Sequence, residues 1–467
     1  MSYWTSTKGN SDMTLWEFIK TKMQAHAGQT IGESNAEMTY DDAAVFAEIF
    51  AQGMKGRRCC AILCQSEMAA ALALLSCFAA GVTAVPLSMR YGKAHCNKIL
   101  DTICPDSIIT DEGGELKLLR FEDGQYLPPP EHPALIMCTS GTTGRPKGAM
   151  LSEKNIITNV SDIASYFALD ETDTILICRP LYHCAVLTGE FLTALVKGAR
   201  IHFYSESFNP AGMLALIAFR QATAFCGTPT LLSMMARFKR DTDQATLRHI
   251  CISGECMGRE VALRIADAFP ESKIYHIYGL TEACPRVSYL PPELFRQYPD
   301  CVGIPLPSVS LKILDHQGEP CAEEEEGILW VKGDNIMLGY YRDPEKTNAV
   351  LKDGWLCTGD IATVNEIGLL KIKGRNDDLI IRSGMNIYPA EIEAVLKTDP
   401  RVREVLIYDY NDRFGTQIGM RMAGDFKTVA EVKQLCIDLL PSFQIPSKIE
   451  LVAELKRNGS GKIIRKV

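Results

Sequence analysis

The chain has 467 residues, which is more than a single hydrophobic core usually serves, so two or more domains are expected. Hydrophobic residues make up 46% of the sequence and charged residues 23%, as in ordinary soluble globular proteins. The formal net charge of −8 argues against general nucleic-acid binding and favours an acidic enzyme.

The 17 cysteines are scattered along the chain and form no Cys-x-x-Cys pair. This pattern excludes a zinc framework and a disulfide scaffold. Reduced thiols used as small core residues fit best, and they indicate a cytoplasmic protein. The polar segment Met1–Asn10 lacks the apolar core of a signal peptide.

The stretch Met68–Met89 carries no charge and is long enough to span a membrane. It is rich in alanine, however, and it contains a glycine and a proline. We therefore predict a buried helix at Met68–Ala80 and a short strand at Val82–Leu87 instead of a membrane span.

Strands and helices alternate over the first 280 residues or so, which predicts parallel sheets with helices on both faces. Helices are expected over Met13–Met54, in particular at Tyr40–Met54, and at Glu153–Phe167. The expected strands are Cys59–Cys64, Val82–Leu87, Asp106–Thr110, Ala134–Cys138, Thr174–Cys178, Arg200–Tyr204, Ala222–Cys226, Arg248–Ile252 and Lys273–Ile277.

Short strands and turns from Val302 to Val331 indicate a small β-rich subdomain, in which Glu323–Glu326 is expected to be a solvated turn. A third unit begins near Asp377. Its expected elements are a helix at Ala390–Lys397, a strand at Glu404–Tyr408, a helix at Val429–Leu439 and a strand at Lys448–Val452.

Four hydroxyls, three glycines and two cations follow the expected strand Ala134–Cys138 within ten residues, from Thr139 to Gly148. Glycines expose backbone N–H groups, hydroxyls donate hydrogen bonds, and Arg145 and Lys147 add positive charge. This is the chemistry of a loop that wraps a polyphosphate. It is not the common phosphate loop, because Pro146 precedes the lysine and Gly148 follows it.

The same ten residues resemble the signature Thr-Ser-Gly-Thr-Thr-Gly-x-Pro-Lys-Gly of the adenylate-forming superfamily, which includes acyl-CoA and aryl-CoA ligases, nonribosomal peptide adenylation domains and luciferases. The resemblance implies that this loop binds ATP. The ATP contacts expected there are Thr139, Ser140, Gly141, Thr142, Thr143, Gly144 and Lys147.

A second family motif, Tyr-Gly-x-Thr-Glu, matches Tyr278–Glu282. An aromatic ring can stack on a base, a hydroxyl can meet phosphate and a carboxylate can hold magnesium. By resemblance, Tyr278 packs on adenine beside Gly279, Thr281 touches the α-phosphate and Glu282 holds Mg²⁺. His276 stands where relatives often carry Asn or Gln, and the turn that contains Gly254, Glu255 and Cys256 resembles a wall of the adenine and acyl pockets.

Two further motifs resemble the family's nucleotide site and hinge. Asp360 ends Trp-x-x-Thr-Gly-Asp, and one carboxylate there can accept both ribose hydroxyls. Arg375 is expected to contact ribose or phosphate, and Asp377 is expected to be the pivot between the domains.

The loop Arg382–Pro389 resembles the family's pantetheine-tunnel loop, in which Ser383, Gly384 and Met385 are the expected contacts, with Met385 replacing the frequent Glu. The segment Asn458–Lys466 resembles the family's Gly-Lys-Ile-x-Arg motif. By resemblance, Lys462 is the catalytic lysine that neutralises the substrate carboxylate and the α-phosphate oxygens.

The acid is suggested by Pro180–Gly189, which resembles the Pro-Leu-Phe-His segment of acyl-CoA and aryl-CoA ligases. His183, Val186 and Leu187 are the expected acyl-pocket residues, although His183 is equally well read as a core histidine. Amino-acid-activating relatives place an Asp here to pair with the α-ammonium group of the substrate. The segment Pro180–Gly189 contains no acidic residue, and the first one after it is Glu190. An apolar or aromatic acid is therefore expected.

The resemblance implies an α/β fold: a large N-terminal domain, residues 1–376, of two α/β subdomains and a small β-rich subdomain, and a small mobile α+β cap, residues 377–467. It also implies an AMP-forming ligase that uses ATP and Mg²⁺ to make an acyl-adenylate and then transfers the acyl group to coenzyme A. An adenylation enzyme that loads a carrier-protein phosphopantetheine is an alternative, and a silent nucleotide-binding or acyl-binding protein is a third.

Overall fold

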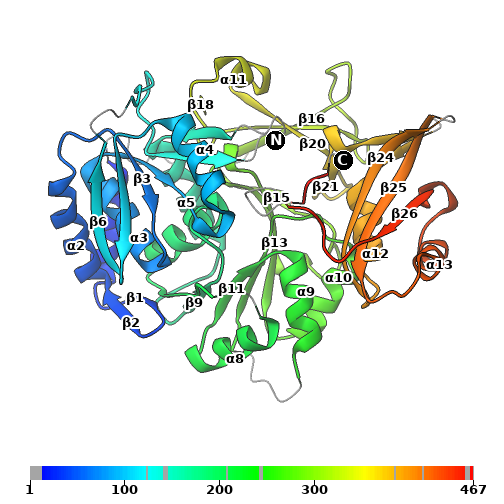
Figure 1. The fold of residues 1–467 in the computed structure, drawn as a ribbon, viewed down its shortest axis with the longest axis horizontal. Helices are drawn as coiled ribbons and strands as arrows, with labels where there is room; N and C mark the ends of the chain where they lie inside the picture. The colour runs from blue at the N-terminus through cyan, green and yellow to red at the C-terminus, as the bar shows by residue number, and fades with distance from the viewer. Residues whose placement is uncertain are drawn as a thin grey trace.

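The computed structural model describes residues 13–121, 125–139, 146–206, 209–240, 246–382, 385–412, 415–457 and 463–465. It is a mixed α/β structure with several sheets, as expected (Figure 1). Two large, mostly parallel sheets lie in the N-terminal part, a smaller antiparallel sheet joins them, and a separate small sheet lies near the C-terminus.

The larger sheet, sheet A, has nine strands among the described residues. Six of these run parallel, namely β1, β10, β9, β11, β12 and β13, and the remaining strands β2, β14 and β15 pair antiparallel with their neighbours. Its carboxyl edge is formed by the ends of β9, β11, β12 and β13, and parallel sheets bind ligands at that edge. The order is β15 (Ile304–Pro305), β14 (Arg286–Leu290), β13 (Lys273–Gly279), β12 (His249–Ile252), β11 (Ala224–Gly227), β9 (Thr174–Ile177), β10 (Arg200–Phe203), β1 (Thr30–Glu33), β2 (Ala36–Thr39).

The second sheet, sheet B, has seven strands in the described part of the chain. Its centre is parallel, whereas β6, β8 and β18 pair antiparallel with their neighbours. The order is β18 (Gly339–Tyr340), β8 (Lys147–Leu151), β7 (Leu135–Thr139), β4 (Thr83–Pro86), β3 (Cys59–Leu63), β5 (Ser107–Glu112), β6 (Glu115–Arg120).

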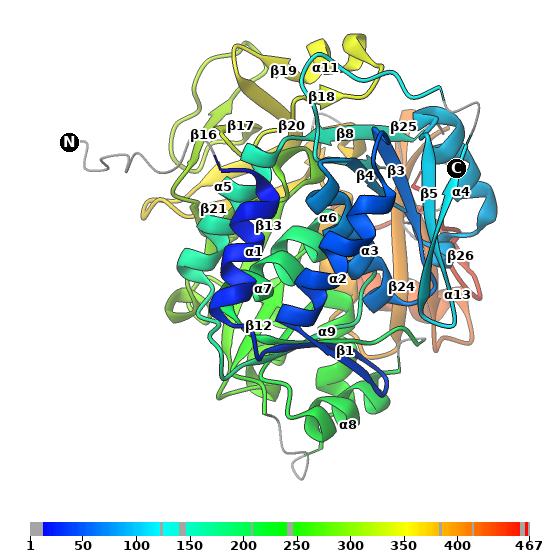
Figure 2. The same cartoon turned by 90° about the vertical axis from the view of Figure 1, so that its left-hand side faces the viewer.

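A shared layer of helices packs between the two sheets, and one apolar core contains residues of both sheets and of these helices (Figure 2). They are α1 (Leu15–Ala25), α2 (Tyr40–Gly53), α3 (Glu67–Ala80), α5 (Glu153–Tyr166) and α7 (Thr193–Lys197). The outer face of sheet A is covered by α8 (Pro210–Arg220), α9 (Pro229–Phe238) and α10 (Arg259–Ala268), and that of sheet B by α4 (Lys93–Ile103). Each sheet is therefore buried on both faces, as the near-continuous apolar strands require.

Helix α3 explains the uncharged stretch that is long enough for a membrane. Ser66 caps its N-terminus by accepting the backbone N–H of Ala69, and the helix ends at Gly81. Nearly every residue between them is buried in the helix layer. A search of the described helices finds none with the length and apolar character that crossing a membrane would need.

The third sheet is antiparallel and consists of β16 (Val309–Leu314), β17 (Gly327–Gly333), β20 (Trp355–Val364), β19 (Leu351–Lys352) and β21 (Leu370–Arg375). This is the predicted β-rich unit, extended beyond Val331. Glu323–Glu326 is an exposed turn in it, as predicted.

From Ile380 onward the chain has an apolar core of its own. The elements are β22 (Ile380–Arg382), β23 (Met385–Ile387), α12 (Pro389–Leu396), β24 (Val402–Asp412), β25 (Gly415–Gly424), α13 (Val429–Leu439) and β26 (Lys448–Leu451). The helix predicted at Val429–Leu439 has these same bounds, and the strand β24 is longer than predicted because it forms a hairpin with β25.

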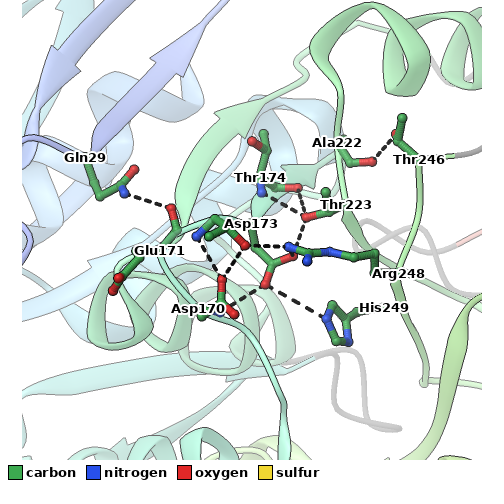
Figure 3. A network of polar contacts seen from close by, with 11 residues as sticks. Gln29, Asp170, Glu171, Asp173, Thr174, Ala222, Thr223, Thr246, Arg248 and His249 are labelled. Carbon is green, nitrogen blue, oxygen red and sulfur yellow. Dashed lines mark hydrogen bonds and ion pairs between the residues drawn. The ribbon is translucent and has the colours of Figure 1, made fainter.

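The amino edge of sheet A, opposite its carboxyl edge, is held by a polar network around Asp173 (Figure 3). This carboxylate is 1% exposed and accepts from Arg248 at 2.7 Å and from the Thr223 hydroxyl at 2.5 Å. His249 Nε2 lies 3.9 Å away. Because these residues lie at the starts of β9, β11 and β12, one buried carboxylate fixes the relative position of three parallel strands.

Candidate active site

The phosphate-loop motif forms the end of a hairpin at the edge of sheet B. Strands β7 and β8 pair antiparallel, and their last matched residues are Thr139 and Lys147. The residues between them that were expected to bind ATP, Ser140–Gly144, lie outside the described residues. The hairpin places Lys147 at the base of the loop. Its contact with the phosphates of ATP stays a prediction.

Lys147 belongs to a cluster with two residues from later in the chain. Its Nζ lies 5.2 Å from the ring centroid of Tyr340 in β18, a cation–π arrangement. The Tyr340 hydroxyl donates to Glu282 Oε1 at 2.8 Å. Glu282 lies in the short helical turn η3 (Thr281–Ala283), which directly follows β13. The structure thus brings the loop base close to Thr281 and Glu282, whose roles at the nucleotide stay predictions.

This cluster fits a magnesium site of the kind that nucleotide enzymes use. Such sites hold Mg²⁺ with one or two carboxylates and the substrate phosphates, and they need no cage of protein ligands. Glu282 supplies a half-buried carboxylate that Tyr340 orients through one oxygen.

Asp360 is the centre of a second cluster next to the first. It is 8% exposed, it accepts the hydroxyl proton of Tyr278, and it pairs with Arg375 at 3.2 Å. Burial raises the pKa of the Asp360 carboxyl, and Arg375 and Tyr278 oppose that shift, while Glu282 adds to it. Tyr278 of this cluster and Glu282 of the first lie four positions apart at the end of β13, so the two clusters are neighbours.

The turn Thr358–Asp360 aims this carboxylate. Thr358 Oγ1 accepts the backbone N–H of Asp360 at 3.0 Å, and Arg375 donates to the Thr358 carbonyl at 2.8 Å. Gly359 has φ +71°, and a Cβ there would lie 3.0 Å from the Arg375 guanidinium. Glycine is therefore required by the backbone conformation as well as by the space.

Gly279 is required for a different reason, which is the close approach of two strands. A Cβ at this position would lie 2.1 Å from the carbonyl oxygen of Pro285. That carbonyl also accepts the N–H of Leu280 at 2.8 Å, so it is held in place. The turn therefore admits no side chain here, and Tyr278 and Thr281 keep their spacing at the end of β13.

The predicted adenine wall lies at the end of β12. Gly254, Glu255 and Cys256 are exposed, and Glu255 accepts from the Thr230 hydroxyl at 2.5 Å. The Cys256 thiol lies within electrostatic reach of the Asp360 carboxylate and of Glu393 and Arg465 in the C-terminal unit. Cys256 thus lies between the nucleotide cluster and the C-terminal unit.

His276 is brought into the sheet beside this wall but is 3% exposed. Burial lowers the pKa of its imidazole to about 4, so the ring is neutral at physiological pH. Its contact with adenine stays a prediction, and the buried position favours a structural role for the side chain.

The segment expected to line the acid pocket follows β9. His183 precedes the short helix α6 (Cys184–Val186) and is half-buried, and its ring lies 5.4 Å from that of Tyr182. The Tyr182 hydroxyl donates to the Cys138 carbonyl at 3.0 Å, just before the phosphate loop. Val186 and Leu187 are fully buried, and Leu187 also lines a small cavity with Glu67, Leu181 and Tyr182.

Glu67 holds this segment from the other side. Its carboxylate accepts the backbone N–H of Leu181 at 3.0 Å. Burial raises the pKa of Glu67 to about 7, and the hydrogen bond from Leu181 opposes the shift. The sequence motifs did not indicate this residue, because it lies 114 positions before its partner.

We expect Glu67→Gln to remove a pH dependence of stability. Since the folded pKa is about 7 and the ordinary value is 4.5, the folded state binds the proton more tightly, and the stability from this group is lost as pH rises through that range. Glutamine keeps an oxygen for Leu181 and does not ionise. Urea unfolding should therefore show the variant gaining about 2–3 kcal/mol over the natural protein between pH 4.5 and 8. A difference that stays constant with pH contradicts this assignment.

Arg465 anchors the end of the chain within the C-terminal unit. The guanidinium donates to both oxygens of Glu393 in α12, at 2.8 and 2.7 Å, and its Nε lies 3.3 Å from Asp378. Arg375 Nε also binds Asp377, the expected pivot, at 3.1 Å. Lys462, Ser383 and Gly384 lie outside the described residues, and Met385 begins β23.

Two arginines of the N-terminal part bind the C-terminal end of α12. Arg237 of α9 donates to the carbonyls of Pro400 and Lys397 at 3.1 and 3.4 Å, and Arg264 of α10 donates to that of Thr398 at 2.8 Å. A helix C-terminus carries partial negative charge, so cations favour it. These contacts stabilise the orientation of the C-terminal unit seen here.

We expect Arg237→Ala combined with Arg264→Ala to slow acid adenylation by about 5- to 150-fold, since losing one hydrogen bond of about 0.5–1.5 kcal/mol from each arginine costs about 1–3 kcal/mol. Thiolation of a supplied acyl-adenylate should be nearly unchanged. Single-turnover measurements of each half-reaction test this. Arg259→Ala is the matched control, because Arg259 lies on α10 but donates to Gln297 at 3.2 Å, within the N-terminal part. Equal slowing of both half-reactions would contradict a role in domain orientation.

Comparisons with known proteins agree with this site. A family model described as "AMP-binding enzyme" matches residues 114–341. A feruloyl-CoA synthase from Amycolatopsis is 30% identical over 98% of this chain and 98% of its own length. A long-chain-fatty-acid–CoA ligase from Yersinia pestis is 33% identical over 71% of this chain and 60% of its own length.

Solved structures match over nearly the whole chain. O-succinylbenzoate coenzyme A synthetase (MenE) from Bacillus subtilis, in complex with its acyl-adenylate intermediate, has a TM-score of 0.85 and 25% identity over 97% of both chains. The same protein with ATP and a magnesium ion has a TM-score of 0.83 over 96% of this chain and 98% of that one.

The protein belongs to the AMP-binding enzyme family of adenylate-forming enzymes. Its reaction class is ATP-dependent ligation of a carboxylic acid to coenzyme A through an acyl-adenylate, with ATP and Mg²⁺ as the nucleotide and its metal. The fold and the enzyme class predicted from the sequence are confirmed.

Proposed function

We propose that this protein activates an apolar or aromatic carboxylic acid and that the residues of the two clusters carry out the nucleotide chemistry. The observation that carries the proposal is that four separate segments of the chain meet at one site, where they place Lys147, Tyr278 and Glu282, Asp360, and Arg375. Tyr278 would pack on adenine, Asp360 would accept the ribose hydroxyls, and the loop with Lys147 would hold the phosphates.

The first step needs no general base, because a carboxylate is already ionised at neutral pH. The acid oxygen attacks the α-phosphorus of ATP, the bond to the β-phosphate oxygen breaks, and pyrophosphate leaves. Magnesium, held by Glu282, would supply charge neutralisation on the phosphates. Thr281 would position the α-phosphate, and Lys462 would neutralise the charge that the carboxylate and the phosphate bring together.

For the second step, we propose that the cap, residues 377–467, rotates about Asp377 and removes Lys462. The loop with Ser383, Gly384 and Met385 would then guide the pantetheine thiol to the acyl carbon. The thiolate sulfur forms the thioester bond, and AMP leaves with the electrons of the mixed-anhydride bond. Arg237 and Arg264 hold α12 in the orientation seen here, which we assign to the first step.

An aromatic or apolar acid is supported by the buried, largely apolar segment after His183 and by a feruloyl-CoA synthase and fatty-acid ligases among the relatives. Pyrophosphate release with ATP, Mg²⁺ and a panel of aliphatic and aromatic acids tests this. No release with any acid contradicts the proposed function. Release with amino acids alone contradicts the proposed substrate class.

In this reaction class the acyl group is transferred to coenzyme A. A phosphopantetheine group on a carrier protein carries the same thiol and is the alternative acceptor. Parallel assays with free coenzyme A and with a phosphopantetheinylated carrier protein separate the two acceptors. We propose a cytoplasmic location, which is supported by all 17 cysteines being free thiols.

A further inference from the structure

A buried polar cluster adjoins the segment in which the sequence predicted the acid pocket. It consists of Arg179, Glu190, Arg286 and Tyr166, and we call it the arginine cluster. Arg179 lies two residues after the end of β9. Glu190 lies in the π-helical turn η2 (Leu187–Leu192), which continues the segment of His183, Val186 and Leu187. π-helical turns occur frequently at functional sites.

The register of sheet A places this cluster on the face that the acid segment covers. Cys226 and Cys251 lie side by side on β11 and β12, in the core shared by both sheets, with Tyr275 next in the row. Both cysteines are within electrostatic reach of Glu190 and Arg286. The cluster therefore borders the inner face of sheet A near its carboxyl edge. Tyr278, near the end of β13, and Gly254, after the end of β12, lie at the same edge.

Arg286 donates hydrogen bonds to neutral partners. It is 4% exposed, and it donates to the Tyr166 hydroxyl at 2.6 Å and to the Gly189 carbonyl at 2.8 Å. A Cβ at position 189 would lie 2.9 Å from the Arg286 Nε, so the glycine makes room for the guanidinium. Arg286 thus holds the turn η2 in place and leaves few donors for a ligand.

The pair of Arg179 and Glu190 is different, because it is incompletely hydrogen-bonded. Arg179 Nη2 lies 2.5 Å from Glu190 Oε1, and the Glu190 side chain is fully buried. Within the described part of the chain, two buried atoms of this pair have no hydrogen-bond partner, namely Arg179 Nε and Glu190 Oε2. Unpaired buried atoms of a charged pair are rare and require an explanation.

The two unpaired atoms define the chemistry that would satisfy them. One is a donor and the other is an acceptor, so they fit a group that both accepts and donates, such as a hydroxyl. A second carboxylate fits less well, because it prefers two parallel donors from one guanidinium and would lie beside the free Glu190 oxygen. An apolar chain leaves both atoms unpaired.

We propose that the acid carries a hydroxyl at the end remote from its carboxylate and that Arg179 and Glu190 recognise it. This inference rests on the proposed function, and it names the substrate class within it: hydroxylated aromatic or aliphatic acids. Glu190 accepts the hydroxyl proton and Arg179 donates to the hydroxyl oxygen, so both residues determine specificity and neither takes part in the chemistry.

The test compares matched pairs of acids that differ by one hydroxyl. Suitable pairs are cinnamic and 4-hydroxycinnamic acid, benzoic and 4-hydroxybenzoic acid, and octanoic and 8-hydroxyoctanoic acid, with 4-carboxycinnamic acid as the dicarboxylate. We expect kcat/KM for pyrophosphate release to favour the hydroxylated member of at least one pair by about 10- to 100-fold, since sites built to bind a hydroxyl reject analogues that lack it.

Variants of Arg179 and Glu190 test whether these two side chains cause the hydroxyl preference. Glu190→Gln and Arg179→Gln should each reduce the hydroxyl preference at least several-fold, mainly by lowering kcat/KM for the hydroxylated acid. A structural defect lowers both members of a pair equally, so the ratio isolates recognition. Arg248→Gln is the control, because Arg248 pairs with the buried Asp173 at the opposite edge of the same sheet. Its ratio should equal that of the natural protein.

The outcomes separate this inference from the proposed function. Turnover without a hydroxyl preference in any pair overturns the inference, while the ligase activity stands. Preference for the dicarboxylate likewise overturns it, in favour of an anionic substrate. Absence of turnover with every acid contradicts the proposed function itself. The natural protein alone gives these results, even if neither variant folds.

Discussion

Replacing Lys462 by alanine is expected to reduce acid-dependent adenylate formation by roughly 10²–10³, the usual effect of removing one electrostatic contact to a developing charge. In the first step, the acid carboxylate and the α-phosphate approach each other while both carry negative charge. Lys462 is the cation that the family resemblance assigns to that approach. Arg465, three positions later, is bound by Glu393 and Asp378 within the cap, and its charge acts on Cys256 at the end of β12.

The second half-reaction is the internal control for this prediction. Thiolation of a chemically prepared acyl-adenylate should proceed at nearly the natural rate in Lys462→Ala, because the lysine has left the site by then. Rapid-quench measurement of both half-reactions on one preparation compares them directly. Equal loss in both steps would refute the division of labour between the cap orientations.

Replacing Asp360 by asparagine is expected to raise the KM for ATP by roughly 10- to 100-fold. A hydrogen bond to an ionised group is worth about 1.5–3 kcal/mol, and an amide presents one acceptor oxygen where the carboxylate presents two. The substitution also removes the negative charge opposite Arg375, whose guanidinium lies 3.2 Å from Asp360. The effect should fall on ATP affinity, while the KM for the acid changes little.

Asp162→Asn is a matched control for this experiment. Asp162 is also a partly buried carboxylate, and it accepts the backbone N–H of Ser308 at 3.1 Å, but it does not contact the nucleotide clusters. Its variant should keep the natural KM for ATP. If Asp360→Asn also kept it, the assignment of Asp360 to the ribose would be wrong.

Much of the fold was predictable because its strands are short, apolar and separated by helices with clear periodicity. Helix α3 shows this well: the Ser66 cap and the glycine after Ala80 bound a run whose alanines exclude a membrane span. The ATP motifs were equally readable, since each needs particular residues at fixed spacing. Tyr278-Gly279 is an example, because no side chain fits between β13 and Pro285.

The contacts between motifs were not predictable from local sequence. Tyr340 orients Glu282 across 58 positions, and Glu67 holds Leu181 across 114 positions. The antiparallel strands β14 and β25 also carry no signal that sets their partners. The π-helical turn at Leu187–Leu192 was missed because helical periodicity does not reveal one extra residue in a turn.

The acid site is where the sequence interpretation was least complete. Glu190 was noted only as the first acidic residue after His183, and neither Arg179 nor Arg286 was singled out. Each becomes informative only when the sheet register and the turn η2 place them together in the core. A buried ion pair formed by residues eleven positions apart in an irregular turn has no sequence signature.

The most direct test of the account is ATP–pyrophosphate exchange with the natural protein and the acid panel, without coenzyme A. The account predicts acid-dependent transfer of labelled pyrophosphate into ATP under these conditions, and AMP together with a thioester only after coenzyme A is added. Formation of ADP and phosphate, or exchange that requires coenzyme A, would contradict an acyl-adenylate made at this site.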